Sequence, residues 1–213
     1  MATKSIKERV YDSLYNDLTN GKYLPNTLLN EKQLVSLFNV SKGPIREALV
    51  QLCDEQLLKS IPRCGYQVIQ ITPKEIRDVN EMRLLLEVAA FEKSYPYLTD
   101  SVLDELEQIC EEGKQHAIEK DISMHWAFNR KFHLSLYRFC GNDVLYDEVN
   151  KLLKFCSREA AQFYSASWQD LDLVEGGVHL RLISALRRHS MNDARKLLIE
   201  DINSIKTGIY NPK

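Results

Sequence analysis

The sequence predicts a mostly α-helical protein in which an N-terminal winged helix-turn-helix is followed by an all-helical bundle. Two patterns support this prediction. Between residues 30 and 68, two short amphipathic segments separated by a tight turn precede two alternating segments typical of a β-hairpin. From residue 73 onward only helical periodicity is found, without strand signals.

The chain has 213 residues, enough for two modest domains or one large one. A boundary is predicted near residues 71–73, because Thr72-Pro73-Lys74-Glu75 combines a capping box with a proline at the first helical position. We therefore expect one domain over residues 1–71 and a second over residues 72–213.

Two helices are predicted before the most informative segment. The first covers residues 4–19 and should pack across the back of the helix-turn-helix; its apolar positions are Ile6, Val10, Leu14 and Leu18. The second should start at Asn30, with Gln33 completing a capping box, and end at Asn39, which tolerates the left-handed conformation. Its predicted apolar face comprises Leu34, Leu37 and Phe38, and Val40 fills the turn.

The following helix carries the main functional signal. Ser41 is expected to cap it, and Pro44 fits its first turn, where a missing N–H costs little. The predicted buried stripe comprises Ile45, Ala48, Leu49 and Leu52. Lys42, Gly43 and Arg46 project from a different side. Free N–H groups at a helix start, together with two cations, favour contacts with phosphates and base edges.

A basic hairpin is predicted directly downstream. Residues 57–61 and 66–69 alternate as strands around the turn Pro62-Arg63-Cys64-Gly65. Taken alone, Lys42 and Arg46 could be ordinary solvated charges near a helix end. A helix-turn-helix followed by a two-stranded wing is a more specific pattern than either half alone. It predicts a protein that binds double-stranded DNA.

Composition is compatible with this prediction. The net charge is −2, yet residues 1–70 hold nine Lys/Arg against seven Asp/Glu, so the basic excess lies at the proposed DNA end. Five scattered cysteines without a C-x-x-C pair indicate a reducing cytosol. No apolar run approaches the roughly 18–20 residues that span a bilayer, and no signal-peptide segment is found. We therefore expect a cytoplasmic protein with no membrane partner.

Six helices are predicted in the second domain. Their ranges are 73–95, 100–119, 122–139, 143–165, 171–188 and 191–207. The predicted breaks are at Tyr95-Pro96, near residues 120–121, at Gly141-Asn142, near Ser167 and at His189-Ser190.

One group of residues in these helices suggests a metal site. Asn129 and His133 are four residues apart and so share a helix face. If the last two helices form an antiparallel hairpin, His179 faces residue 200 or 201, which brings Asp201 to the same interior point. Imidazoles and a carboxylate in an apolar bundle are costly unless they bind something, and a divalent metal is the economical candidate.

Two alternatives to this metal site remain open. Asn129 and His133 could satisfy each other or backbone groups, with Asp201 a surface charge. His125 lies four residues before Asn129 on the same face and could replace one ligand.

The N-terminal residues also carry a family resemblance. Residues 29–68 resemble the DNA-binding domain of the GntR family of bacterial transcription regulators, in the runs N-E-K-Q-L, V-S-K-G-P-I-R-E-A-L and R-C-G-Y-Q-V. The resemblance implies DNA contacts at Lys32, Lys42, Arg46, Arg63 and Gly65, and Ser41 and Gly43 at the same helix start are added as candidates. The family usually has Arg where this chain has Lys32 and Lys42. Because Lys cannot make the bidentate fork to guanine, we expect Arg46 to make the base contact.

Residues 73–207 resemble the FCD domain, the helical effector-binding domain of one large GntR subgroup. The matching runs are D-V-N-E-M-R-L-L-L-E, F-N-R-K-F-H-L-S-L, G-N-D-V-L and V-H-L-R-L-I-S-A-L. In many members an Asp or Asn, a His four residues later and two further His bind a metal, which implies Asn129, His133, His179 and Asp201 here. The family expects His at the last position, but an Asp still ligates a divalent ion of the Zn, Ni or Mn class. Other members bind effectors without any metal.

The resemblance further implies a small carboxylate effector, such as an organic acid or a sugar acid. Open metal positions would take carboxylate oxygens while an Arg binds the remainder, and the candidates are Arg83 and Arg130. Arg83 could instead pair with Glu87 at i+4, and Arg130 could face solvent. We expect a homodimer in which each subunit places its DNA-contacting helix, the one that begins after Ser41, on one half of a pseudo-palindromic operator.

Two other classes of function are considered. A metal-dependent enzyme needs a placed general base and an open coordination position, and no H-E-x-x-H or comparable signature appears, so we predict that the chain is not an enzyme. The alternative is an effector- or metal-binding helical protein with a weakened DNA-binding head, which the lysines at positions 32 and 42 keep open.

Overall fold

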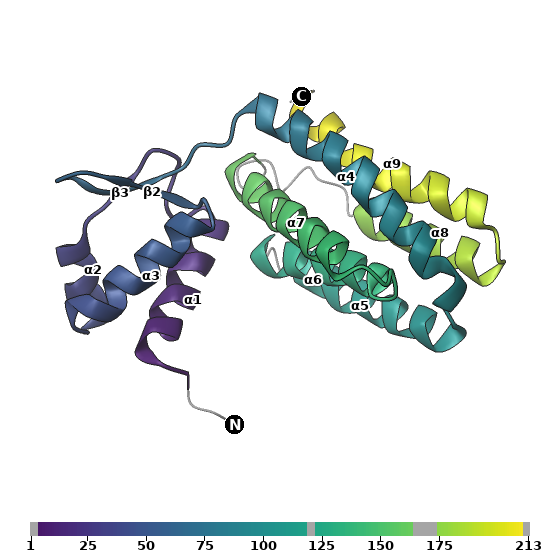
Figure 1. The fold of residues 1–213 in the computed structure, drawn as a ribbon, viewed down its shortest axis with the longest axis horizontal. Coiled ribbons are helices and arrows are strands. Elements are labelled where there is room, and N and C mark those ends of the chain that lie inside the picture. Colours follow the sequence, from purple (N-terminus) through teal and green to yellow (C-terminus); the bar gives the residue numbers. More distant parts are fainter. Residues whose placement is uncertain (1–3, 119–121, 164–173, 211–213) are drawn as a thin grey trace. The chain divides into compact units, whose positions relative to one another are not determined.

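The computed structural model describes residues 4–118, 122–163 and 174–210. The chain divides into two compact units, residues 1–71 and 72–213. Helices dominate both units, and the described strands form one small antiparallel sheet in the first (Figure 1). This confirms the predicted fold class, mostly α with an N-terminal winged helix-turn-helix and a helical bundle.

The described residues of the first unit form three helices and a three-stranded sheet. The helices are α1 (Ile6–Thr19), α2 (Glu31–Phe38) and α3 (Lys42–Asp54). The strands are β1 (Leu28–Leu29), β2 (Leu58–Ile61) and β3 (Gly65–Val68), in the order β1-β3-β2. The sequence did not indicate β1, because two residues are too few for an alternating pattern to be visible.

The helix starts follow the local chemistry with one exception. Ser5 and Glu8 form a capping box, so α1 begins two residues later than predicted. Asn30 caps α2 by accepting a hydrogen bond from the Lys32 N–H at 2.8 Å. The predicted capping box with Gln33 is wrong, because the Asn30 side chain bonds the second helical N–H instead of the third.

The core of the first unit is built around α3. All four residues of its predicted stripe are buried, and they pack with Val10, Leu14 and Leu18 of α1. Asn39 ends α2 at φ 51°, as predicted. The predicted apolar face of α2 is partly wrong, because Leu34 is 3 % exposed whereas Leu37 is 63 % exposed. An eight-residue helix packed against α3 buries only a narrow stripe.

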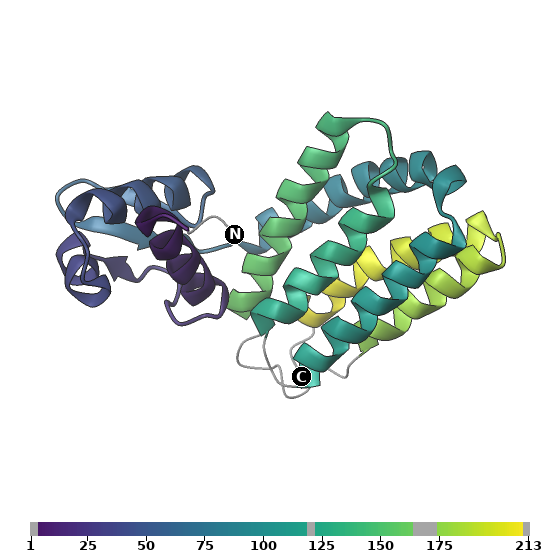
Figure 2. The ribbon, with the colours of Figure 1, turned by 90° about the horizontal axis from the view of Figure 1, so that it is seen from below.

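The second unit is a bundle of helices (Figures 1 and 2). They are α4 (Pro73–Ser94), the short 3₁₀ helix η1 (Tyr95–Tyr97), α5 (Asp100–Ile118), α6 (Ile122–Tyr137), α7 (Asp143–Phe163), α8 (Val174–Arg187) and α9 (Met191–Tyr210). Thr72 and Glu75 form the predicted capping box at the start of α4. The breaks at Gly141 and His189 are confirmed by left-handed backbone, with φ 64° and 54°. The predicted breaks near residues 120–121 and Ser167 lie outside the described residues.

Buried apolar side chains from α4 to α9 form one core in this unit. Helices α8 and α9 pack side by side as the predicted antiparallel hairpin, and α9 also contacts α4 (Figure 2). Among the described helices, none combines the length and the apolar character that crossing a membrane requires.

Candidate nucleic-acid interface and candidate metal centre

The start of α3 is open to solvent. Ser41 stands at the cap position with extended backbone, but its hydroxyl makes no capping hydrogen bond, so it caps α3 by position only. A Cβ placed on Gly43 would meet nothing within 4 Å, which leaves the first turn unobstructed. Lys42 and Arg46 are exposed. Backbone N–H groups and cations are thus presented together, as an anion-binding helix start requires.

Glu31, which the sequence analysis overlooked, links three elements of this unit. Its Oε2 lies 2.9 Å from Lys42 Nζ on α3, and its Oε1 accepts a hydrogen bond from the Tyr66 hydroxyl on β3 at 3.3 Å. The hydrogen bond from Lys42 is the main cause of the lowered pKa of Glu31. Lys32, beside it on α2, is exposed. No described carboxylate forms an ion pair with Arg46.

The wing tip places Arg63 in solvent, in the left-handed region at φ 65°. Gly65, at φ 128°, lies so close to β1 that a Cβ would be 2.4 Å from the Leu29 carbonyl oxygen. The close pairing of β1 with β3 therefore explains a glycine at this position without any DNA contact.

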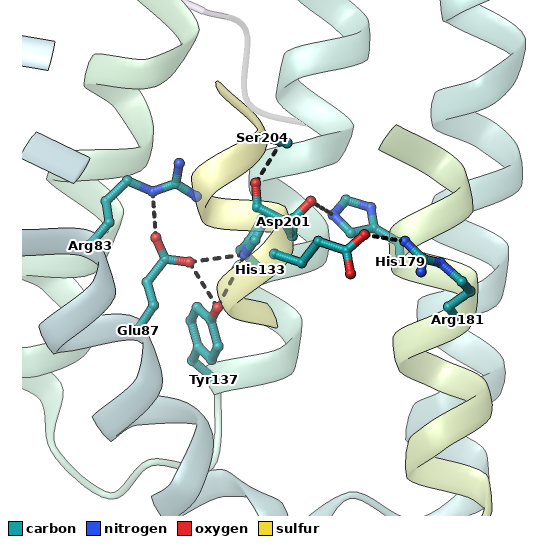
Figure 3. A network of polar contacts seen from close by, with 9 residues as sticks. Arg83, Glu87, His133, Tyr137, His179, Arg181, Asp201 and Ser204 are labelled. Atoms are coloured by element: carbon teal, nitrogen blue, oxygen red, sulfur yellow. Dashed lines mark hydrogen bonds and ion pairs between the residues drawn. The ribbon is translucent and has the colours of Figure 1, made fainter. Parts of the chain in front are cut away.

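In the second unit, three predicted ligands converge from three helices. His133 on α6, His179 on α8 and Asp201 on α9 are all buried, and one potential ligand atom from each lies within 4.8 Å of the others. Asp201 Oδ2 is 3.1 Å from His133 Nε2, and its Oδ1 is 3.4 Å from His179 Nε2 (Figure 3). The His179 ring stacks on Phe132 with 3.9 Å between ring centroids, which fixes its orientation.

The donor set fits a divalent cation. Although both Nε2 atoms lie close to Asp201, neither makes a hydrogen bond within the described part of the chain, and both are buried. Two ligands roughly 2.1 Å from one cation are separated by about 3.0–3.4 Å in octahedral or tetrahedral geometry. The two histidine–Asp201 separations, 3.1 Å to Oδ2 and 3.4 Å to Oδ1, lie in this range.

A second layer of contacts holds His133 from the other side. Its Nδ1 is 3.0 Å from Glu87 Oε2 and 3.1 Å from the Tyr137 hydroxyl, which itself donates to Glu87 at 2.8 Å. Arg83 Nε donates to Glu87 Oε1 at 2.5 Å, so the Arg83–Glu87 pair considered from the sequence is confirmed. The role of Tyr137 was missed; its position four residues after His133 was the available signal.

These contacts shift the pKa values of the buried groups. Burial lowers the pKa of His133, but Glu87 and Asp201 on its two sides outweigh burial and raise it to about 9. Burial raises the pKa of Glu87, yet Arg83 and His133 hold it at about 2. The pKa of Asp201 lies well below its usual range despite burial, because His179 and His133 favour its charged form. The carboxylates are therefore ionised at neutral pH.

Three other predicted residues make no described contact with this cluster. Asn129 is half-buried one turn before His133, and no contact described in the structure joins it to the other ligands. His125 Nδ1 lies 3.3 Å from the Gly113 carbonyl oxygen of α5, so it does not replace a ligand in the cluster. Arg130 is half-buried and donates to Asn150 Oδ1 of α7 at 3.4 Å, which corrects the expectation that it could simply face solvent.

Comparisons with known proteins agree with both resemblances. The pattern of the FCD domain matches residues 78–204, and that of the bacterial regulatory proteins of the gntR family matches residues 6–68. The HTH-type transcriptional regulator YdhC of Bacillus subtilis is 33 % identical over 151 residues, which cover 68 % of this chain and 67 % of the relative. The HTH-type transcriptional repressor RspR of Escherichia coli is 23 % identical over 208 residues, which cover 97 % of this chain and 90 % of the relative.

Among solved structures, E. coli McbR/YncC superposes with a TM-score of 0.77. The match covers 98 % of each chain at 22 % sequence identity, and at that identity it supports the fold alone.

Proposed function

The chain belongs to the GntR family of bacterial regulatory proteins and carries an FCD domain, and from this premise we propose a specific regulatory mechanism. In this mechanism the protein binds a pseudo-palindromic operator as a homodimer in the cytoplasm. A small carboxylate effector, held in the helical unit through a divalent metal, modulates that binding. The family and the relatives named above are transcription regulators, so the chain is not an enzyme, as its sequence predicts.

The exposed start of α3 carries the DNA-binding part of the proposal. Arg46 is free to fork onto a guanine edge, while Lys42 and Lys32 contact phosphates as point charges. The unbonded Ser41 hydroxyl and the open backbone at Gly43 add phosphate contacts at the helix start. At the wing tip, Arg63 and the Gly65 backbone complete the interface.

A gel-shift titration against a pool of genomic fragments tests this interface. Arg46→Ala should weaken operator binding by roughly tenfold or more, because one bidentate base contact is worth about 1–3 kcal/mol. Arg46→Lys keeps the charge but not the fork, and it should weaken specific binding while preserving binding to random fragments. Unchanged operator affinity in Arg46→Ala would contradict the proposal.

In the helical unit, His133, His179 and Asp201 would hold the cation, with Asn129 as a weaker oxygen donor. When bound, such an ion would offer open coordination positions to carboxylate oxygens. Glu87 lies 3.0 Å from His133 Nδ1 and would accept its hydrogen bond, so that a cation would take the place of the Nε2 proton that the raised pKa of His133 retains near neutral pH.

Two arginines are candidates for binding the rest of the acid. Arg83 is anchored through Nε by Glu87, which leaves its buried Nη1 without a hydrogen bond in the described structure. Arg130 on α6 is the second candidate, since its only described hydrogen bond, to Asn150, is long.

Elemental analysis of the purified protein, combined with a thermal-shift screen of organic acids, tests the metal and the effector together. Bound metal and stabilisation by an acid are expected, because a ligand that binds only the folded state raises the unfolding temperature. If no metal is found and no acid stabilises the protein, the cluster serves structural packing only.

Regulation requires that the acid bind the DNA-competent and DNA-incompetent arrangements with different affinities. The helical unit is expected to supply most of the dimer contacts. Gel filtration at concentrations where DNA binding is observed should return a dimer, and a monomer would count against the proposed operator geometry.

One observation favours the alternative of a helical effector-binding protein with a weakened DNA-binding head. Lys42 is already paired with Glu31, so one of the two cations at the start of α3 is partly neutralised. Stabilisation by an acid without any gel shift would support this alternative over the operator-binding regulator.

A further inference from the structure

A group of buried polar atoms lies on the packed faces of α4 and α7, and the proposed metal centre does not use it. Asn80 and Arg83 come from α4 and Glu159 from α7, and each is at most 1 % exposed. Five of their atoms make no hydrogen bond in the described part of the chain: Asn80 Nδ2 and Oδ1, Arg83 Nη1, and both carboxyl oxygens of Glu159.

The three side chains are neighbours. Arg83 lies against the Cys156 thiol of α7, and its charge also acts on the Glu159 carboxyl. Helices α4 and α7 pack together and run in opposite directions (Figure 1). Asn80, one turn before Arg83, therefore faces Glu159, one turn after Cys156. Neither hydrogen-bonds to the other, so their polar atoms are left for a third group.

Such a group of atoms is unusual on energetic grounds. More than about 90 % of buried polar groups in proteins are hydrogen-bonded, and an unsatisfied one costs about 1–3 kcal/mol. Apolar side chains at positions 80 and 159 would remove this cost. Five such atoms at one place therefore indicate binding of a polar ligand.

The chemistry of the five atoms restricts that ligand. The Asn80 amide both donates and accepts, and Arg83 Nη1 only donates. Burial raises the pKa of Glu159 to about 7, although Arg83 opposes the shift, so near neutral pH its carboxyl serves as acceptor or donor. A carboxylate only accepts and an ammonium only donates, whereas a hydroxyl does both. Hydroxyl groups match Asn80 and Glu159, which both donate and accept, while Arg83 Nη1 is left to donate to the carboxylate of the same ligand.

We propose that Asn80 and Glu159 form a second binding point in the helical unit, which takes the hydroxyl groups of a hydroxylated carboxylic acid. Arg83 stands between this point and the metal centre, because its Nε is tied to Glu87, which contacts His133. The acid's carboxylate lies toward Arg83 and the metal centre, and its hydroxyls lie toward α7. This inference rests on the proposed function, since it assumes that a carboxylate binds in the same interior.

Isothermal titration calorimetry with D-gluconate and hexanoate, two six-carbon acids with and without hydroxyls, tests the inference on the wild-type protein. Gluconate should bind at least roughly tenfold more tightly, which corresponds to one or two hydrogen bonds. Without the second binding point, an apolar interior would favour hexanoate.

Two variants locate the effect. Asn80→Leu should lower gluconate affinity by about tenfold and leave hexanoate affinity unchanged. Glu159→Gln keeps the shape and should give a smaller loss confined to gluconate. Glu111→Gln, at an exposed position of α5, is the matched control and should change neither affinity. Thermal unfolding of each variant establishes that it is folded before titration.

The outcomes separate this inference from the proposed function. Equal affinities for the two acids in the wild type would mean that water alone fills the group, and the inference would be overturned. An Asn80→Leu variant that binds both acids as the wild type does, or that loses both equally, would overturn it while leaving carboxylate binding intact. If neither acid binds the wild type, the proposed carboxylate effector fails, and this inference fails with it.

Discussion

Glu31 and Lys42 form an ion pair of 2.9 Å between α2 and α3, although the Lys42 side chain is 69 % exposed. A surface pair of this kind stabilises the fold little, about 0–1 kcal/mol. Its larger effect is on the charge that α3 presents. Any phosphate that approaches Lys42 must compete with a carboxylate that also holds Tyr66 of the sheet.

Glu31→Gln should therefore strengthen binding to random DNA at low salt. The released Lys42 would neutralise one more phosphate, so the slope of log K against log salt should steepen by about 0.9. Fluorescence anisotropy at several salt concentrations measures this slope. Glu47→Gln, at an exposed position of α3 without a described ion pair, is the control. An unchanged slope in Glu31→Gln would mean that Lys42 does not contact phosphate.

The two glycines of the proposed interface should respond differently to alanine. Gly65→Ala places a Cβ 2.4 Å from the Leu29 carbonyl oxygen at a φ of 128°, so we expect a loss of about 1–3 kcal/mol in the free energy of unfolding. Gly43→Ala meets open space in a helical turn and should leave stability equal or slightly higher. Urea unfolding compares them, and similar losses for both would contradict the close approach of β1 to Gly65.

Removing one imidazole from the cluster should abolish metal retention. His133→Ala and His179→Ala each delete one of the three proposed ligands that converge in the bundle. Elemental analysis after dialysis, and the thermal shift on adding Zn²⁺, should both fall to background. His125→Ala removes a histidine from the same helix outside the cluster and should retain the metal. Equal retention in all three variants would place the metal elsewhere.

Burial of Glu159 should make stability depend on pH. Its pKa is raised from 4.5 to about 7 by burial, with Arg83 of α4 the charged group that opposes the shift. Between these values the folded chain holds a proton that the unfolded chain has released. The contribution of the protonated Glu159 carboxyl to the free energy of unfolding is therefore fully present below about pH 4.5 and is lost as pH rises through about 7.

The loss is at most about 3 kcal/mol, since each pKa unit corresponds to about 1.4 kcal/mol. Because other groups titrate in the same range, the measurement is the difference in unfolding free energy between wild type and Glu159→Gln at about pH 5 and about pH 8. The wild type should lose more stability than the variant over this range. Parallel pH profiles would mean that water solvates Glu159.

Two leucines of α2 differ strongly in solvent exposure and give a last pair of matched variants. Leu34→Ala, at a position 3 % exposed, should lower the free energy of unfolding by about 2–5 kcal/mol. Leu37→Ala, three residues later and 63 % exposed, should change it by less than about 0.5 kcal/mol. Denaturant unfolding of both variants checks the packing of α2, and comparable losses would show that the side of α2 carrying Leu37 is covered.

The sequence by itself determined the fold class, the helices and the hairpin of the wing. Caps such as Thr72, left-handed helix ends such as Asn39, and the apolar stripe of α3 depend on neighbouring residues, and local chemistry predicts them well. The convergence of His179 with Asp201 was also predictable, because a short connection forces two helices to run back antiparallel.

Only the tertiary structure decided which polar groups meet across distant elements. The contacts of Glu31 with Lys42 and Tyr66, and of Glu87 with His133, join helices and strands whose packing distance no residue spacing encodes. The same holds for Asn80 and Glu159, which look like ordinary surface residues of amphipathic helices in the sequence. They are buried because α4 and α7 pack along the faces that carry them.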